Sequence, residues 1–281
     1  MPIKNINWEG PDTDRKPSAS IWGRCPLEQI RAGTVNGYVF EDNFTSMNIT
    51  PPTTEGNWGA SGGDYALFTS SGATVTPALA VSNVGQTGIV VASANNNDAI
   101  GLRTVNIPFA LAQNKSKLWF ECRILKSTIA NTAFDLFCGF YANAAMTANV
   151  PFSAAATLAD NNLFGFWSKS TAGANCAVSY KSSGVAAADI STTDAVMVAN
   201  TYTKLGLKYE FSGDAFGTYA LSFYQDGTRL ATAFQVPSAA GTFPINAAMG
   251  LCFAIRNAAG SSPGSAQLQW WRAAQLVTPY N

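Results

Sequence analysis

The 281-residue sequence contains no histidine. Histidine is the commonest general base and a frequent metal ligand, so its absence excludes Ser-His-Asp and Cys-His catalysis. A pair of carboxylates facing each other across a groove could still hydrolyse glycosides. None of the six glutamates has a second carboxylate two or four residues away on one face of a predicted strand: Glu9, Glu28, Glu41, Glu55, Glu121 and Glu210. We therefore expect no enzymatic activity. A glycanase with dispersed carboxylates is the least favoured alternative.

Charged residues on the predicted strands favour structural pairing over chemistry. Glu121 and Arg123 lie two residues apart and share one strand face, as do Lys208 and Glu210. Opposite charges on neighbouring strands commonly pair. We expect cross-strand ion pairs at these positions.

Metal and cofactor sites are not expected. Asp160-Asn161-Asn162 and the run from Asn95 to Asp98 offer loop oxygens to a cation such as calcium, but both lack spaced acidic ligands and are typical of Asn-rich turns. The five cysteines are widely spaced, odd in number and without a CxxC motif, which argues against disulfides and zinc: Cys25, Cys122, Cys138, Cys176 and Cys252. All but Cys25 lie in apolar runs, where we expect reduced, buried side chains.

Aromatic side chains could form a surface that stacks on sugar rings, although core packing is the favoured interpretation: Trp119, Phe164, Phe166, Trp167, Trp270 and Trp271. Consecutive strand residues point to opposite faces, so one of Trp270 and Trp271 must face away from the core. We expect that side chain to be covered by an N-terminal arm or by a neighbouring subunit.

From Tyr38 onward the apolar residues alternate with a period of two, which indicates short strands. The expected strands are 38–44, 65–69, 88–92, 99–105, 118–125, 134–141, 163–168, 174–181, 203–211, 219–225, 228–234, 249–256 and 267–276. So many strands fit two packed antiparallel sheets, which predicts an all-β sandwich over residues 37–281.

Three local features refine this prediction. The strand 118–125 is apolar on one face and mixed on the other, which predicts a half-buried strand. Asp226-Gly227 predicts a two-residue hairpin turn, because both residues tolerate positive φ. The segments 142–159 and 184–195 are rich in Ala, Ser and Thr, and predict long loops or edge coverings.

Residues 1–36 predict an irregular N-terminal arm, because they contain nine charged residues and four prolines. A short helical turn could cover Pro26 to Arg31. Apolar anchors indicate that the arm docks, either on its own sandwich or on a neighbouring subunit. The candidate partner-binding residues are Trp8, Ile21, Trp22 and Leu27 of the arm, with Trp270 and Trp271.

The chain carries 17 basic and 17 acidic residues, and charged residues make up only 12% of it. This is about half the usual share, and it indicates a neutral surface suited to lying against other proteins. The sequence contains no cluster of basic residues that would indicate nucleic-acid binding. It also contains no apolar run long enough to span a membrane. Because the N-terminus lacks a secretory pattern, we expect synthesis and assembly in a cytosol.

Several segments resemble those of tailed-bacteriophage virion structural or capsid-decoration proteins with a concanavalin A-like jelly roll. They are Ile21 to Leu27, Gly37 to Phe44, Asn161 to Trp167, Phe223 to Gly227 and Trp270 to Leu276. None is specific by itself, but together they span nearly the whole chain.

The resemblance implies a non-enzymatic cement or decoration protein, located on the virion and assembled in the host cytoplasm. Its implied partners are the major capsid protein or other virion proteins and further copies of itself, as a dimer or trimer. The alternative function is a carbohydrate-binding, lectin-like adhesion module, because a lectin fold is implied; a lectin's set of metal ligands has no match in the sequence.

Overall fold

The computed structural model describes the greater part of the chain, and every structural statement refers to that part. The described residues are 16–44, 58–60, 65–69, 78–79, 89–92, 98–106, 108–111, 116–131, 133–142, 151–211, 219–235, 243–258 and 264–277.

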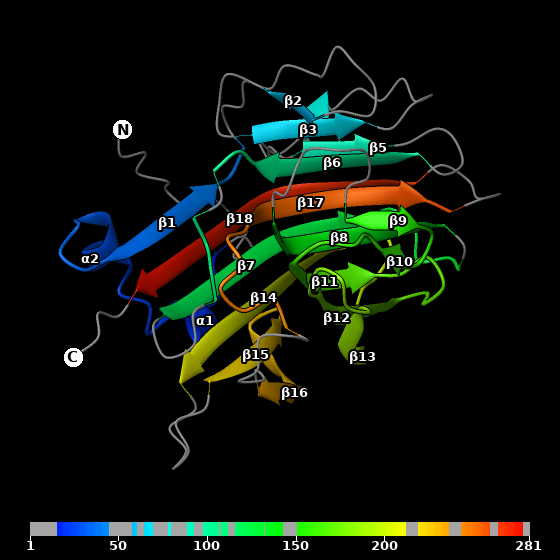
Figure 1. Cartoon of the computed structure of the whole chain (residues 1–281). Coiled ribbons are helices and arrows are strands. Elements are labelled where there is room, and N and C mark those ends of the chain that lie inside the picture. The colour runs from blue at the N-terminus through cyan, green and yellow to red at the C-terminus, as the bar shows by residue number, and fades with distance from the viewer. Residues whose placement is uncertain are drawn as a thin grey trace.

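Two antiparallel sheets face each other (Figure 1). Sheet A has the order β16-β15-β14-β7-β18-β5-β4, and β1 pairs with the C-terminal half of β18. Its strands are β1 (Gly37–Asp42), β4 (Ala78–Leu79), β5 (Ile89–Ala92), β7 (Ser116–Lys126), β14 (Tyr202–Phe211), β15 (Tyr219–Gln225), β16 (Thr228–Gln235) and β18 (Ser265–Val277).

Sheet B has the order β13-β12-β11-β8-β17-β6-β3-β2. Its strands are β2 (Trp58–Ala60), β3 (Tyr65–Thr69), β6 (Ala99–Thr104), β8 (Phe134–Tyr141), β11 (Leu163–Ser168), β12 (Asn175–Lys181), β13 (Ala188–Val196) and β17 (Gly250–Asn257). A small separate hairpin joins β9 (Phe152–Ala154) to β10 (Thr157–Leu158). The predicted two-sheet antiparallel sandwich is therefore confirmed.

The main core fills the space between the sheets. Phe120 of sheet A meets Phe140 of sheet B with ring centroids 5.2 Å apart, and Phe140 stacks on Phe164 at 4.7 Å. Successive side chains in a strand point to opposite faces of the sheet, so every second residue of each strand faces this core. The four cysteines predicted as buried are free thiols within this apolar interior or just beneath the outer face of sheet B: Cys122, Cys138, Cys176 and Cys252.

All thirteen predicted strands are present, with ends shifted by at most two residues. The prediction of loops over 142–159 and 184–195 is wrong in part, because β9 and β10 lie in the first segment and β13 in the second. Strand β13 is the edge of sheet B, and its sequence, Ala-Asp-Ile-Ser-Thr-Thr-Asp-Ala-Val, contains few large apolar side chains, so there is little hydrophobic period to detect.

The Asp226-Gly227 hairpin is confirmed between β15 and β16. Both residues have positive φ, 49° and 79°, as a two-residue turn of this type requires. This turn lies close to the arm, because the Gly227 carbonyl accepts a hydrogen bond from the Ser20 hydroxyl at 2.6 Å.

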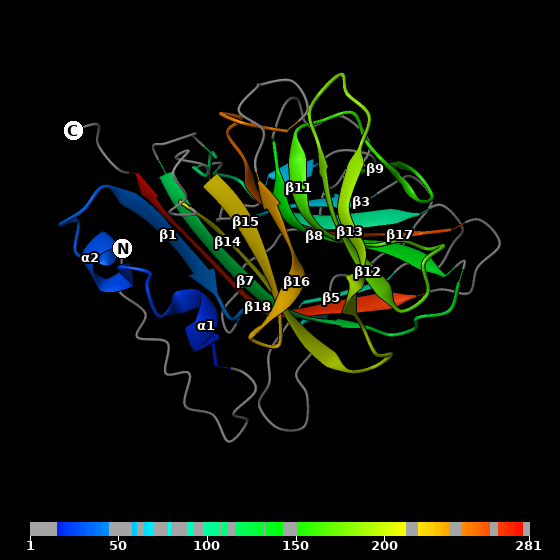
Figure 2. The same cartoon turned by 90° about the horizontal axis from the view of Figure 1, so that it is seen from below.

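Two short helices form the described part of the arm: α1 (Ala19–Trp22) and α2 (Leu27–Arg31). Helix α2 confirms the helical turn expected near Pro26. Figure 2 shows both helices along sheet A; α1 contacts β7 and β14, and α2 contacts β1. No helix in the described ranges is long and apolar enough to cross a membrane.

Candidate functional site

Residues 16–36, the described part of the arm, dock on the outer face of sheet A of the same chain. Ile21 is fully buried and lies over Gly206 of β14, so closely that a Cβ on this glycine would collide with the Ile21 Cδ1. Ile21, Ile30 and Trp119 belong to one apolar cluster between the arm and the sheet, and Trp22 and Leu27 pack against it. For residues 16–36 the structure shows the intramolecular docking mode, one of the two that the sequence left open.

Glu121 is the polar centre of this contact. Its carboxylate accepts hydrogen bonds from the Ser18 backbone N–H at 2.9 Å, the Ser18 hydroxyl at 2.5 Å and the Trp22 indole N–H at 2.8 Å. Burial raises the pKa of Glu121, and the hydrogen bonds from Ser18 and Trp22 act in the opposite direction. The predicted cross-strand ion pair at Glu121 is therefore wrong, because the arm supplies the partners of its carboxylate.

The half-buried interpretation of strand 118–125 is wrong for the same reason. Along β7 every described side chain except that of Lys117 is buried, including Trp119 and Glu121 on the outer face. The arm covers this face. The sequence of the strand alone does not indicate that another segment will cover it. Lys208 and Glu210 instead pair with each other along β14, at 3.3 Å.

Trp270 and Trp271 face opposite sides of β18, as predicted. Trp271 points into the core between the sheets, where it contacts the rings of Phe40 and Tyr65. Trp270 lies beside Arg123 on the outer side, and both tryptophans are fully buried within the single chain. Trp8 lies outside the described residues. Of the other candidate partner-binding residues, Ile21, Trp270 and Trp271 are buried within the chain, and Trp22 and Leu27 are partly buried against sheet A.

The favoured interpretation of the predicted aromatic side chains as core residues is confirmed, and the sugar-stacking alternative is not supported. All six aromatic side chains are buried: Trp119, Phe164, Phe166, Trp167, Trp270 and Trp271. They pack in the core or beneath covering segments.

A second buried carboxylate, Asp135, lies on the outer face of sheet B. Its oxygens accept hydrogen bonds from the Ala156 N–H at 2.8 Å, the Ser170 N–H at 2.9 Å and the Trp167 indole at 3.3 Å. Burial raises the pKa of Asp135, and these hydrogen bonds act in the opposite direction. Asp135 thus ties the β9–β10 hairpin and the loop after β11 to the sheet.

The Asn-rich turns behave as turns where the structure describes them. Asp160 Oδ1 accepts the Gly184 N–H at 2.8 Å, and Asn162 Oδ1 accepts the Ser183 N–H at 2.9 Å. Within the described ranges no three His, Cys, Asp or Glu side chains gather at one point that could hold a metal ion. The run from Asn95 to Asn97 lies outside the described residues.

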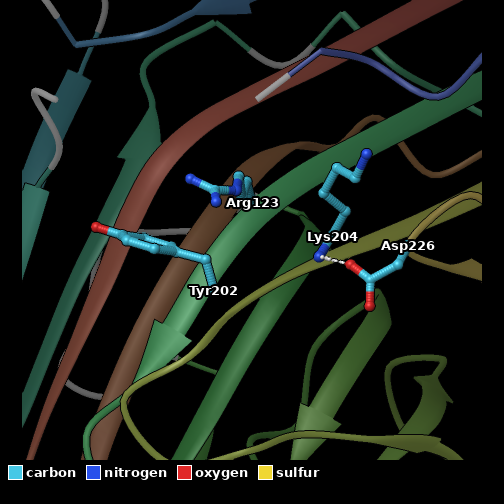
Figure 3. Close-up of a pocket in the computed structure, with 4 residues that line it drawn as sticks. All are labelled: Arg123, Tyr202, Lys204 and Asp226. Carbon is cyan, nitrogen blue, oxygen red and sulfur yellow. Dashed lines mark hydrogen bonds between the residues drawn. The ribbon is translucent and has the colours of Figure 1, made fainter. Parts of the chain in front are cut away.

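A small cavity of about 200 Å³ opens on the outer face of sheet A beside the arm (Figure 3). It is lined by Arg123 of β7, Tyr202 and Lys204 of β14, and Asp226 of the β15–β16 turn. From the sequence, Arg123 was expected only to form a cross-strand ion pair, and Asp226 only to occupy a hairpin turn. No sequence signal joins these four positions, because the pairing of β14 with both β7 and β15 brings them together.

No protein-family model matches this sequence, and no curated protein is similar to it. Solved structures, by contrast, share its architecture. A protein of unknown function from Shewanella oneidensis MR-1 is 12% identical with a TM-score of 0.53, covering 91% of this chain and 96% of that one. Peanut lectin is also 12% identical with a TM-score of 0.53, covering 87% and 100%.

An endo-β-1,4-glucuronan lyase from the fungus Trichoderma reesei is 12% identical with a TM-score of 0.50, covering 80% of this chain and 95% of that one. At these identities the likeness shows the fold and no more. The chain has a concanavalin A-like jelly-roll β-sandwich fold.

Proposed function

We propose that this chain is a non-enzymatic structural protein of a bacteriophage particle, which decorates or cements a capsid through contacts between subunits. The observation that supports the non-enzymatic part of the proposal is that two buried carboxylates on the outer faces of the sheets receive their hydrogen bonds from the chain's own segments. Glu121 and Asp135 are fully buried and bound by the chain's own covering segments. A carboxylate that cannot reach a substrate cannot act as its acid, base or nucleophile, so both serve to fasten the arm and the hairpin.

The composition and the resemblance support the virion part of the proposal. A chain with 12% charged residues and no net charge has a surface suited to extensive contact with other proteins. The resemblance to phage virion proteins spans the arm, the opening strand, the central strand, the hairpin and the closing strand. The partners proposed on this basis are the major capsid protein or another virion protein, and one or two further copies of this chain.

The test is to purify particles of the phage that encodes the chain and image them by cryo-electron microscopy. We expect density for the sandwich at regular positions on the particle, and mass spectrometry of the same particles should detect the chain. The contacts should survive raised salt, since few charges are available to contribute. Absence of the chain from purified particles would overturn the proposal.

Carbohydrate binding is a second candidate, favoured by the cavity beside the arm. Tyr202 supplies an aromatic ring, while Arg123, Lys204 and Asp226 supply donors and acceptors of the kind that bind sugar hydroxyls. The lectin-type fold is compatible with this function without requiring it. A glycan array probed with the purified full chain tests the candidate, and the absence of binding to every glycan would remove it.

A further inference from the structure

Strand β1 forms one edge of sheet A, because it pairs with β18 on one side and with no strand on the other. Figure 2 shows β1 running along the outside of β18. The two strands pair in one continuous register from Gly37 to Asp42, without a bulge. An edge strand of this regular kind presents a row of backbone N–H and C=O groups to whatever lies beside it.

The direction of these backbone groups follows from the pairing with β18. The Val277 N–H donates to the Asn36 carbonyl at 2.9 Å, directly before β1 begins. In an antiparallel pair, residues that bond across the pair alternate with residues whose N–H and C=O point the other way. The even-numbered residues of β1 therefore bond to β18. The odd-numbered residues, Gly37, Val39 and Glu41, direct their N–H and C=O groups to the free edge.

The free edge of β1 has no backbone partner among the described segments. The side chain of Glu41 is bound by Arg31 and Arg272, and these contacts leave its backbone groups uninvolved. The side chain of Tyr38 is 50% exposed, although it is large and aromatic. Both the backbone and the side chains of this edge can therefore be reached from outside the chain.

The other described sheet edges are protected in ways that β1 is not. Strands β2 and β4 are three and two residues long. Strands β13 and β16 pair irregularly with their neighbours, and their two edges are joined. The Thr232 N–H donates to Asp194 Oδ2 at 3.1 Å, and the Gln225 amide bonds to the backbone of Val196. Short, irregular or covered edges prevent strand addition, so β1 is the edge suited to receive another strand.

From this arrangement we propose that β1 pairs antiparallel with β1 of a second copy of this chain, so that sheet A continues across a twofold axis. The matching register places Val39 opposite Val39 of the second copy and Gly37 opposite its Glu41. Each of these pairs exchanges both of its free backbone hydrogen bonds, as opposed residues of an antiparallel ladder do.

The side chains of β1 are self-complementary in this register. Tyr38 lies opposite Phe40 of the second copy, at a position without hydrogen bonds, where facing side chains come closest. Phe40 is only partly buried against the core, so the contact covers both rings, and aromatic cross-strand pairs stabilise sheets. The acidic end of β1, Glu41 and Asp42, falls opposite the uncharged start of the other strand. This complementarity favours a second copy over an unrelated extended segment.

The inference rests on the part of the proposed function that names further copies of this chain as partners, and it specifies the surface through which two copies meet. Sedimentation velocity of the full chain over a concentration series tests it. We expect a dimer that dissociates on dilution. A wild-type chain that stays monomeric at every concentration would overturn the inference.

Tyr38→Lys tests the side-chain contact. It replaces an aromatic ring by the charge that commonly blocks edge pairing, so it should weaken the dimer at least about tenfold. Because the Tyr38 side chain is half exposed, the fold should tolerate the change. Tyr38→Phe keeps the ring and is the matched control, which should alter the dimer dissociation constant by less than about threefold.

Val39→Pro tests the backbone contact. Proline removes an N–H that faces the free edge and that the ladder with β18 does not use, and edge strands tolerate proline in this position. The dimer should be lost. Val39→Thr keeps both the N–H and the branched side chain, and should retain the dimer. Circular dichroism identifies a variant that has not folded, in which case Tyr38→Lys decides. A dimer of wild-type strength in Tyr38→Lys would overturn the inference.

Residue-resolved amide hydrogen exchange tests the register. In the wild-type dimer the Val39 and Glu41 amides should exchange at least about tenfold more slowly than in Tyr38→Lys, because only the second copy supplies their acceptors. The even-numbered amides of β1 should be slow in both proteins. Fast exchange at Val39 and Glu41 in a wild-type dimer would place the contact elsewhere and contradict the inference.

Failure of this inference is distinguishable from failure of the proposed function. A monomeric chain found at regular positions on purified particles would refute the pairing of β1 and retain the virion role. A dimer that pairs through β1 and is absent from the particles would do the reverse. Density for a different protein beside β1 on the particle would also refute self-pairing.

Discussion

Ser18 and Glu121 are 103 residues apart in the sequence, and Ser18 donates both its backbone N–H and its hydroxyl to the Glu121 carboxylate. This contact joins the N-terminal arm to the middle of sheet A. Trp22 completes the set of donors through its indole. The arm is therefore held by a buried polar anchor as well as by apolar packing.

Replacing Glu121 by Ala should release the arm. Three donors would lose their acceptor, and each unsatisfied buried donor costs about 1–3 kcal/mol. We expect the free energy of unfolding to fall by at least about 2 kcal/mol, and protease cleavage to increase between residues 16 and 36. Urea denaturation and limited proteolysis measure these effects.

The control for this variant is Glu28→Ala, because the Glu28 side chain is 83% exposed and contacts only Arg31 in α2. It should change stability by less than about 0.5 kcal/mol. An arm that is equally resistant to protease in both variants would show that apolar contacts alone hold it.

Gly206→Ala should disturb the packing of Ile21, because the added methyl group would occupy the space of the Ile21 Cδ1. Overpacking of this kind costs about 1–3 kcal/mol. The double variant Gly206→Ala with Ile21→Ala should lose less free energy of unfolding than the two single variants lose together. A double-mutant cycle measures this difference. Strictly additive effects would mean that the two side chains do not meet in solution.

Asp135→Ala should loosen the β9–β10 hairpin. The substitution removes the acceptor of the Ala156 and Ser170 N–H groups and of the Trp167 indole. We expect faster amide hydrogen exchange over residues 151–160 and a loss of about 2 kcal/mol or more in unfolding free energy. Asp160→Ala is the control, because the Asp160 side chain is 64% exposed and accepts the Gly184 N–H instead of a hairpin group; it should leave exchange over residues 151–158 slow.

Lys126 should make stability depend on pH in the alkaline range. It lies at the end of β7, donates to the Ser168 hydroxyl at 2.8 Å and faces the ring of Phe134 at 4.8 Å. Burial lowers its pKa to about 8, while nearby Cys176 and Asp135 act in the opposite direction. In the unfolded chain the lysine keeps its ordinary pKa of about 10.4.

At this one group the unfolded state binds more protons than the folded state between these two values, so the contribution of Lys126 to stability should rise with pH from about 8 to about 10.4. Lys126→Met removes this contribution. It should raise stability at pH 7 by roughly 3 kcal/mol relative to the wild type, and the difference should shrink as pH approaches 10. Urea denaturation of both proteins at pH 7, 8, 9 and 10 measures this, and a constant difference across the series would contradict the assignment.

The strands could be predicted from the sequence because their signal is local. Leu205 and Leu207 alternate with Lys204 and Lys208, and this period of two identifies β14 without knowledge of its neighbours. The weak pattern of β13 carries no such signal, since an edge strand with small polar residues has no strongly apolar face. Its pairing with β12 is visible only in the structure.

The candidate site could be predicted less well than the fold. Asp226 was found as a turn residue, and Arg123 as a charge on a strand face. Their meeting with Tyr202 and Lys204 requires β14 to lie between β7 and β15. Strand order in a sheet depends on contacts between distant segments, which a local pattern does not contain.

The amino-acid sequence by itself determined the all-β class, the Asp226-Gly227 turn, the buried thiols and the lack of histidine chemistry, because each depends on residue type or on spacing within a few positions. Only the tertiary structure decided that the arm folds back on its own sheet, that Glu121 and Asp135 fasten covering segments, and that two cations border a cavity. These relationships join residues far apart in the chain, and they arise from the free energy of packing whole elements together.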